Sequence, residues 1–152
     1  MAIRQMKADD VPHALAFWAS FEGVQLNEGD TLEDVSRFLE RNPGMSFVAI
    51  EAGRIAGAVM AGHDGRRGFM YHLAVAEPYR GRGIGRGLVG EALRALRAAG
   101  ISKSHVMVFR TNAAGNAFWD RLKTRRRDDL HLYTMSSPSD IGLDGCLMDT
   151  PL

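Results

Sequence analysis

Two early segments of the chain carry apolar side chains every three or four residues, and this spacing predicts two amphipathic helices. The first helix begins after Asp9 and Asp10, whose carboxylates can cap its amino end. After a polar loop, residues 23–30, the second begins at Thr31, which can form a capping box with the aspartate three residues on, and it stops at residues 42–44. The expected buried stripes are Val11, Ala14, Leu15, Trp18 and Phe21 in the first helix and Leu32, Val35, Phe38 and Leu39 in the second.

Short apolar runs bounded by turn residues follow, and they predict β-structure. Strands are expected at residues 3–6, 46–51, 54–62 and 68–75. Ala52-Gly53 joins the second of these strands to the third, and Asp64-Gly65 joins the third to the fourth in a hairpin.

Beyond residue 75, helix-like and strand-like runs alternate. Helices are expected at residues 84–99 and 112–122, and further strands at residues 104–109 and 129–135. Helices, then a meander of strands, then alternating strands and helices predict an α/β (α+β) fold with a mixed central sheet and helices on both faces. The crossover from strand 68–75 through a helix to strand 104–109 should be parallel and right-handed.

Between strand 68–75 and the next helix lies the run Arg80-Gly81-Arg82-Gly83-Ile84-Gly85. Bare glycine backbone and a helix amino end suit a bound anion, and the arginines add permanent positive charge. A flexible turn with arginines for solubility is the plainer alternative. Residues 85–90 also fit the dinucleotide fingerprint G-x-G-x-x-G, but residues 76–83 intervene after the strand and no acidic residue stands about 20 positions on. A P-loop is excluded, since no Gly-Lys-Ser/Thr is present.

Composition narrows the class of protein. At 152 residues, we expect a single domain over residues 1–135, with an irregular carboxyl-terminal extension at 136–152 that is rich in Pro, Gly and Asp. The net charge of +1 gives no overall attraction to nucleic acid or membranes, so an anion site has to be local. One cysteine excludes an internal disulfide, and His105 and His131 lack partners at ligand spacing, so no metal is expected. Without a signal-like or membrane-spanning run, we expect a cytoplasmic protein.

The glycine loop and its surroundings resemble the acetyl-CoA motif of the GNAT family of N-acetyltransferases. That motif reads Arg/Gln-x-x-Gly-x-Gly/Ala, and here it appears as Arg80, Gly83 and Gly85 after Leu73-Ala74-Val75. Downstream, residues 112–122 are similar to the family's second CoA element, in which Asn, Ala and an aromatic pair recur. The resemblance covers about residues 1–135, and it extends to small bacterial members of unassigned substrate.

The resemblance implies the GNAT acyl-CoA N-acyltransferase fold, whose parallel strands splay apart to admit acetyl-CoA as co-substrate. The strand before the loop would pair with the pantetheine arm, and the loop amides would hold the pyrophosphate. Asn112 matches a pantetheine contact, and capping its helix is an equally open role. The residues assigned to the cofactor in this way are Leu73, Ala74, Val75, Arg80, Gly81, Arg82, Gly83, Ile84, Gly85, Arg86, Asn112, Asn116 and Trp119.

The implied activity is that of an acetyl-CoA-dependent N-acyltransferase (EC 2.3.1 type), in which the acetyl group passes directly to an amine in a ternary complex. Trp119 stands where the family often has a tyrosine, and an indole N–H does not release its proton. Tyr71 could replace that tyrosine, because strand alternation places it on the face of Phe69 and Leu73. His72 is the candidate base, although its parity points away from Tyr71.

Three acidic residues, Glu22, Glu28 and Asp30, cluster around the first interhelix loop, where acceptors commonly approach in the family. They could attract a cationic amine, and an exposed acidic loop without a ligand is the alternative. The acceptor stays open among protein amino termini, lysine, polyamines, amino acids and antibiotics, as does a homodimer through the terminal strands.

Two departures from the family pattern leave alternatives open. Lys123-Thr124 replaces the Gly-Phe that usually ends the last helix, so this helix either ends differently or is less stable. Trp119 and the lack of a clear base keep a non-catalytic acyl-CoA-binding module as the alternative function. Nucleic-acid binding through Arg125-Arg126-Arg127 conflicts with the near-zero net charge and the lack of an aromatic stacking platform.

Overall fold

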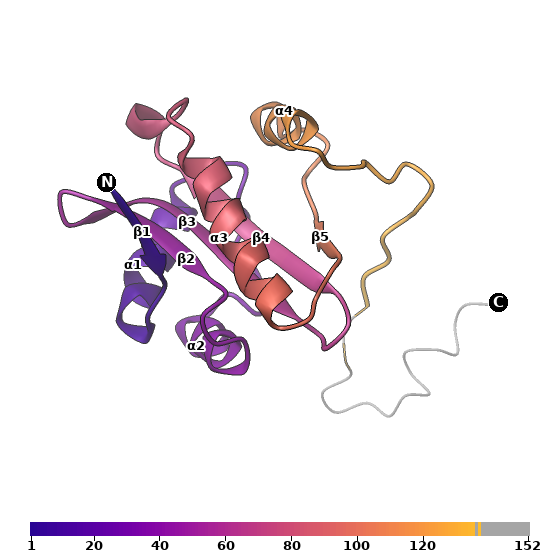
Figure 1. Cartoon of the computed structure of the whole chain (residues 1–152), viewed down its shortest axis with the longest axis horizontal. Coiled ribbons are helices and arrows are strands. Elements are labelled where there is room, and N and C mark those ends of the chain that lie inside the picture. Colours follow the sequence, from indigo (N-terminus) through magenta and orange to yellow (C-terminus); the bar gives the residue numbers. More distant parts are fainter. Residues whose placement is uncertain (136, 138–152) are drawn as a thin grey trace. The chain divides into compact units, whose positions relative to one another are not determined.

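The computed structural model describes residues 1–135 and 137 (Figure 1). The chain divides into two units at Ala117/Phe118, and each is described by itself. The boundary falls inside one helix, so that helix contributes to both units. No helix in the described ranges is both long enough and apolar enough to cross a bilayer.

A five-stranded mixed sheet forms the centre of the first unit (Figure 1). The strands lie side by side in sequence order, antiparallel except for the parallel final pair. They are β1 (Ala2–Gln5), β2 (Phe47–Glu51), β3 (Arg54–His63), β4 (Gly68–Val75) and β5 (Ser104–Val106). The mixed sheet and the parallel crossover predicted from the sequence are therefore confirmed.

The described helices follow the predicted apolar periodicity, except that Leu32, expected in the buried stripe of the second helix, is exposed in its first turn. They are α1 (Val11–Ala19), α2 (Leu32–Arg41), α3 (Ile84–Ala98) and α4 (Ala113–Arg121), with short 3-10 helices η1 (Ala8–Asp10) and η2 (Glu77–Tyr79). Thr31 caps α2 as expected, since its hydroxyl accepts a hydrogen bond from the Asp34 amide; the Asp34 carboxylate accepts from that hydroxyl, so the return bond to the Thr31 amide that would complete a capping box is not formed. The side-chain cap expected for α1 is wrong: the Asp10 carboxylate accepts from the Lys7 amide and from the guanidinium of Arg4 instead.

Helices cover both faces of the sheet. On one face, α1 and α2 bury Trp18 and Val35 against Val48, Ala58 and Met60 of β2 and β3. On the other face, α3 presents a fully buried stripe whose members include Leu88 and Leu96. Each buried leucine contributes about 1.5–3 kcal/mol to folding, so the two faces together fix the sheet between the helices.

A β-bulge interrupts β4 in the middle of its pairing with β3. Ala58 pairs with Ala74 and Met60 pairs with Tyr71, so two residues of β4, His72 and Leu73, stand opposite one residue of β3. His72 adopts φ = 56°, a left-handed conformation that is uncommon outside glycine. The bulge resets the alternation of β4, so Tyr71 and Ala74 both face α1 and α2.

The carboxyl-terminal part of the chain differs from prediction in two places. Residues 129–135 form no strand, and their apolar side chains are more than half exposed. A strand requires a paired neighbour for its backbone groups, and this run has none among the described residues. β5 is also shorter than residues 104–109, because its ladder with β4 stops at Val106.

The helix α4 ends without the expected glycine. The hydroxyl of Thr124 donates to the Trp119 carbonyl and the Thr124 amide donates to the Leu122 carbonyl, so the last turn is closed by a side chain. Lys123 is not among the described residues with positive φ, so the left-handed strain does not arise. Of the two alternatives left open by Lys123-Thr124, the helix therefore ends differently.

Candidate functional site

The glycine loop sits at the amino end of α3, as the sequence predicts. Gly81 (φ = 75°) and Gly83 (φ = 80°) are left-handed, and Gly83 is the residue that precedes the helix. Within the described chain, the amides of residues 81–86 donate to no protein acceptor, whereas the amide of Arg80 donates to the Glu77 carbonyl. Several backbone donors at a helix amino end therefore remain available to an anion.

Arginine side chains surround this loop. The Arg80 Nε donates to the carbonyl oxygen of Val75 at 3.0 Å, and its guanidinium lies 6.0 Å from the ring centre of Phe21. Arg82 lies 5.6 Å from the ring centre of Tyr79 and, like Arg86, is exposed. The loop thus combines free amides with positive charge, and Arg80 connects it to the end of β4.

The strands β4 and β5 separate halfway along β4. Their ladder joins Gly68–Met70 to Ser104–Val106 and does not continue. Residues 71–75 therefore have one edge without a strand partner in the described part of the chain. Beyond β5, Met107 and Phe109 are about half exposed on the diverging segment. An extended ligand can add to such an edge through main-chain hydrogen bonds.

The bulge places His72 on the α1/α2 face of the sheet, which corrects the parity expected from simple alternation. The His72 ring lies 5.3 Å from the ring of Trp18 and 6.5 Å from that of Tyr71. Its Nε2 lies 2.8 Å from Oδ1 of Asp30. Both side chains are mostly buried, with 16% of His72 and 12% of Asp30 exposed.

The three acidic candidates of the loop before α2 separate in the structure. Asp30 is held against His72, and its second oxygen accepts a hydrogen bond from the Asn27 amide. Glu22 and Glu28 are exposed and, among the described residues, have no ion-pair partner. Only Asp30 is thus brought to the other candidate residues.

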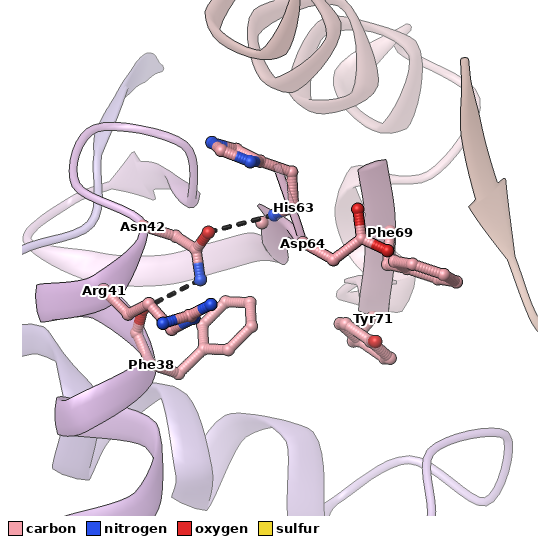
Figure 2. Close-up of a pocket in the computed structure, with 8 residues that line it drawn as sticks. Phe38, Arg41, Asn42, His63, Asp64, Phe69 and Tyr71 are labelled. Carbon is pink, nitrogen blue, oxygen red and sulfur yellow. Dashed lines mark hydrogen bonds between the residues drawn. The ribbon is translucent and has the colours of Figure 1, made fainter. Parts of the chain in front are cut away.

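A pocket of about 240 Å³ opens beside Tyr71, between the end of α2 and the start of β4 (Figure 2). Figure 2 shows Phe38 and Arg41 on the α2 side, facing Phe69 and Tyr71 on β4. The buried Asn42 braces its wall, since its Oδ1 accepts from the His63 amide at 2.9 Å and its Nδ2 donates to the Phe38 carbonyl.

The pocket contains several ionisable groups. Partial burial raises the pKa of the Tyr71 phenol, so this group keeps its proton at neutral pH. Backbone N–H groups of Arg67 and Arg66 lower the pKa of Asp64, whose carboxylate closes the β3–β4 turn. The pocket therefore offers aromatic surface, a cation and a carboxylate beside the bulge.

The asparagines predicted to touch the cofactor have structural partners. The Oδ1 of Asn112 accepts a hydrogen bond from the Gly115 amide and so caps α4. Of the two roles left open for Asn112, the helix cap is therefore confirmed. Asn116 Nδ2 donates to the Phe109 carbonyl at 2.9 Å and to the Asn112 carbonyl at 2.8 Å. In the second unit, Trp119 packs edge-on against Phe118.

Sequence reasoning missed the pocket and the Asp30–His72 contact. The pocket gathers residues from α2, the β3–β4 turn and β4, and no short motif joins them. Asp30 and His72 are 42 positions apart, so only the fold brings them together. The described residues also contain no cluster of three or more His, Cys, Asp or Glu side chains at a spacing that could hold a metal ion.

Comparison with known proteins gives a consistent set of relatives. The family model described as "Acetyltransferase (GNAT) family" matches residues 13–123. Acetyltransferase SG1711 from Sodalis glossinidius is 33% identical over 132 residues, which cover 87% of this chain and 92% of that protein.

Two solved structures share the fold. An aminoglycoside acetyltransferase from an uncultured soil metagenomic sample, in complex with sisomicin, matches with a TM-score of 0.69 and 19% identity, covering 90% of this chain and 96% of that one. A predicted acetyltransferase from Clostridium acetobutylicum, solved with acetyl-CoA, matches with a TM-score of 0.69 and 15% identity, covering 88% and 95%.

Proposed function

Because the chain belongs to the GNAT family of acetyltransferases, we propose that it transfers the acetyl group of acetyl-CoA directly to an amine within a ternary complex. The observation that carries this proposal is the continuity between two open surfaces. The unpaired edge of residues 71–75 leads, through η2, into a loop with free backbone donors at the amino end of α3.

The loop is proposed to bind the pyrophosphate of acetyl-CoA. The free amides of residues 81–86 provide donors, and the dipole of a long helix contributes about 0.3–1 kcal/mol, or up to ~2 kcal/mol when the anion is partly buried. The guanidinium groups of Arg80, Arg82 and Arg86 add charge. Together these terms are consistent with micromolar affinity, about −8 kcal/mol.

The pantetheine arm is proposed to lie along Leu73, Ala74 and Val75. A strand advances about 3.3 Å per residue, so an arm that starts at the loop and pairs with these residues reaches the bulge within about 10 Å. The acetyl group would then lie beside His72 and Tyr71. The Val75 carbonyl can accept from the arm while it still accepts from Arg80, because a carbonyl has two lone pairs.

The reaction requires an unprotonated amine. A lysine-type amine has a pKa of about 10.4, so its neutral form costs about 4–5 kcal/mol at neutral pH. His72 is proposed to accept the proton, and Tyr71, which stays protonated, to donate one to the leaving thiolate. Holding the amine against the thioester contributes more than either proton transfer, about 7–11 kcal/mol.

The acceptor is proposed to enter through the pocket beside Tyr71, with its amine directed to the bulge. The exposed carboxylates of Glu22 and Glu28 would attract a cationic acceptor to the nearby loop. Asn112 and Asn116 are kept as proposed cofactor contacts beside the hydrogen bonds that they make within the chain. The cofactor contact expected of Trp119 stays a prediction from the sequence. A single domain over residues 1–135 and a homodimer through the terminal segments complete the proposal.

The cofactor site is tested by replacing both Gly83 and Gly85 with valine. A side chain at Gly83 is strained at φ = 80°, and two β-branched residues would cover the amides that meet the phosphates. We expect acetyl-CoA affinity, measured by calorimetry, to fall at least tenfold while circular dichroism shows a folded protein. Unchanged affinity would remove the loop from the site.

Catalysis is tested by following free-thiol release from acetyl-CoA with a panel of amines: lysine, spermidine, a peptide with a free amino terminus and an aminoglycoside. Thiol release above the background without amine supports an N-acetyltransferase. Tight acetyl-CoA binding without release across a wide panel would favour the non-catalytic acyl-CoA-binding module.

A further inference from the structure

We infer that Asp30 is a positioning residue for the acetyl transfer: it holds His72 in the tautomer whose Nδ1 takes the proton from the acceptor amine. This inference rests on the proposed function, and it moves Asp30 from acceptor binding, where the sequence placed it, to the proton-transfer machinery.

The contact itself fixes the tautomer. A carboxylate only accepts hydrogen bonds, so at 2.8 Å the Nε2 of His72 must carry the hydrogen and donate it to Oδ1 of Asp30. In the neutral imidazole, Nδ1 then holds the lone pair. The ring therefore has one nitrogen committed to the protein and one left as a base.

The surroundings hold both groups in place. Asp30 uses its second oxygen to accept from the Asn27 amide, and the Asp30 amide donates back to the Asn27 carbonyl. The ring of the fully buried Trp18 packs against His72 on the side of α1. With at least 84% of each side chain covered, neither group is free to turn to other partners.

Backbone strain at His72 points to a functional reason for this arrangement. A left-handed conformation outside glycine costs about 1–3 kcal/mol and persists only where the surrounding structure enforces it. Here it turns the imidazole to the face of Asp30 and Tyr71, at the position where the unpaired edge of β4 begins. A regular strand would place this ring on the α3 face.

The proton balance is complete without a further reactant. The ammonium of the acceptor gives one proton to Nδ1 of His72, and the nitrogen lone pair attacks the thioester carbonyl. A C–N bond forms, the C–S bond breaks, and the CoA thiolate leaves with its electron pair. Tyr71 donates its phenolic proton to the thiolate and is reprotonated by the remaining extra proton on nitrogen, and His72 returns its own proton to water.

The test compares Asp30→Asn with the wild-type chain. Asn27 and His72 meet different oxygens of Asp30, and in an asparagine one of these positions becomes an NH2 donor, so the Nε2–H donor loses its acceptor or the tautomer reverses. We expect kcat to fall at least 100-fold, while the acetyl-CoA Kd from calorimetry stays within twofold. Asp30→Glu, which keeps a carboxylate, should remain within tenfold of wild type in kcat.

A spectroscopic readout separates positioning from simple stabilisation of the loop. The nitrogen-15 shifts of the neutral His72 ring should show the Nε2–H form in the wild-type chain, and a changed pattern in Asp30→Asn. The matched control is Glu33→Gln, which removes an exposed carboxylate three residues away and should leave both kcat and the His72 spectrum unchanged.

The outcomes distinguish this inference from the proposed function. If acetyl-CoA binds and thiol is released, yet Asp30→Asn retains wild-type kcat or His72 shows the Nδ1–H form, the inference is wrong and the function stands. If no thiol is released with any amine, the proposed function fails. The ring shifts would then still decide whether Asp30 sets the tautomer.

Discussion

At the scale of single residues, burial sets the chemistry of Tyr71 in the candidate site. Tyr71 is half-buried among Phe38 and Phe69, and this burial raises the pKa of its phenol. A raised pKa keeps the proton on the phenol oxygen at neutral pH, so Tyr71 carries a proton when the thiolate leaves. Its proposed role is to donate that proton to the thiolate.

Replacing Tyr71 with phenylalanine tests that role. The ring and its contacts with Phe38 and Phe69 stay, so we expect the melting temperature to change by less than about 2 °C. Without the hydroxyl, kcat for thiol release should fall about 10- to 100-fold with little change in acetyl-CoA affinity. His13→Gln, on the exposed side of α1, serves as the control. A Tyr71→Phe variant with full activity would show that the thiolate leaves unassisted.

At the scale of elements, β4 shows how far the sequence could predict the site. Its bounds, residues 68–75, were predicted correctly, because a continuous apolar run between turn residues is a local signal. The bulge at His72 and Leu73 was not predicted, because it arises from the register with β3 and involves no glycine. The face of every residue after the bulge changed with it.

The strand predicted at residues 129–135 does not form, and the reason is related. Residues 129–135 have the apolar composition of a strand, but strand formation depends on a neighbour that composition does not report. The glycine loop lies at the amino end of α3 as expected, because its signal, glycines between a strand and a helix, is contained within a few consecutive residues. Non-local pairing thus explains both the bulge that was missed and the strand that does not form.

The attachment of β1 to η1 gives a prediction with a pH dependence. Arg4 donates two hydrogen bonds to the Asp10 carboxylate, at 2.7 and 2.9 Å, and these lower the pKa of Asp10. Asp10→Asn should lower the free energy of unfolding by about 1 kcal/mol at pH 7, measured by urea denaturation. Acetyl-CoA affinity should not change.

The sign of the pH effect follows from that lowered pKa. The stabilisation is fully present above the pKa of aspartate in the unfolded chain, about 3.9, and is lost as the pH falls through the lower pKa of the folded state. The difference between wild type and Asp10→Asn should therefore be constant from pH 5 to 7 and shrink below about pH 4. A difference that persists undiminished at low pH would contradict this assignment.

At the scale of the whole molecule, the prediction concerns the extent of the domain. Over residues 1–135 the chain is expected to hold every element that the proposed function uses, from the loop before α2 to the end of α4. A chain ending after Met135 should therefore unfold with a free energy within about 0.5 kcal/mol of the full chain and bind acetyl-CoA with a Kd within twofold. Loss of binding in a folded truncation would assign residues 136–152 to the site.

The positive φ at position 72 limits which amino acids can replace histidine there without backbone strain. Glycine, asparagine, aspartate and histidine tolerate that torsion far better than branched or bulky residues do. Among these four residue types, histidine alone has an ordinary side-chain pKa near neutrality. A chain that keeps this backbone torsion therefore has few residues that could replace His72 in its proposed role as proton acceptor.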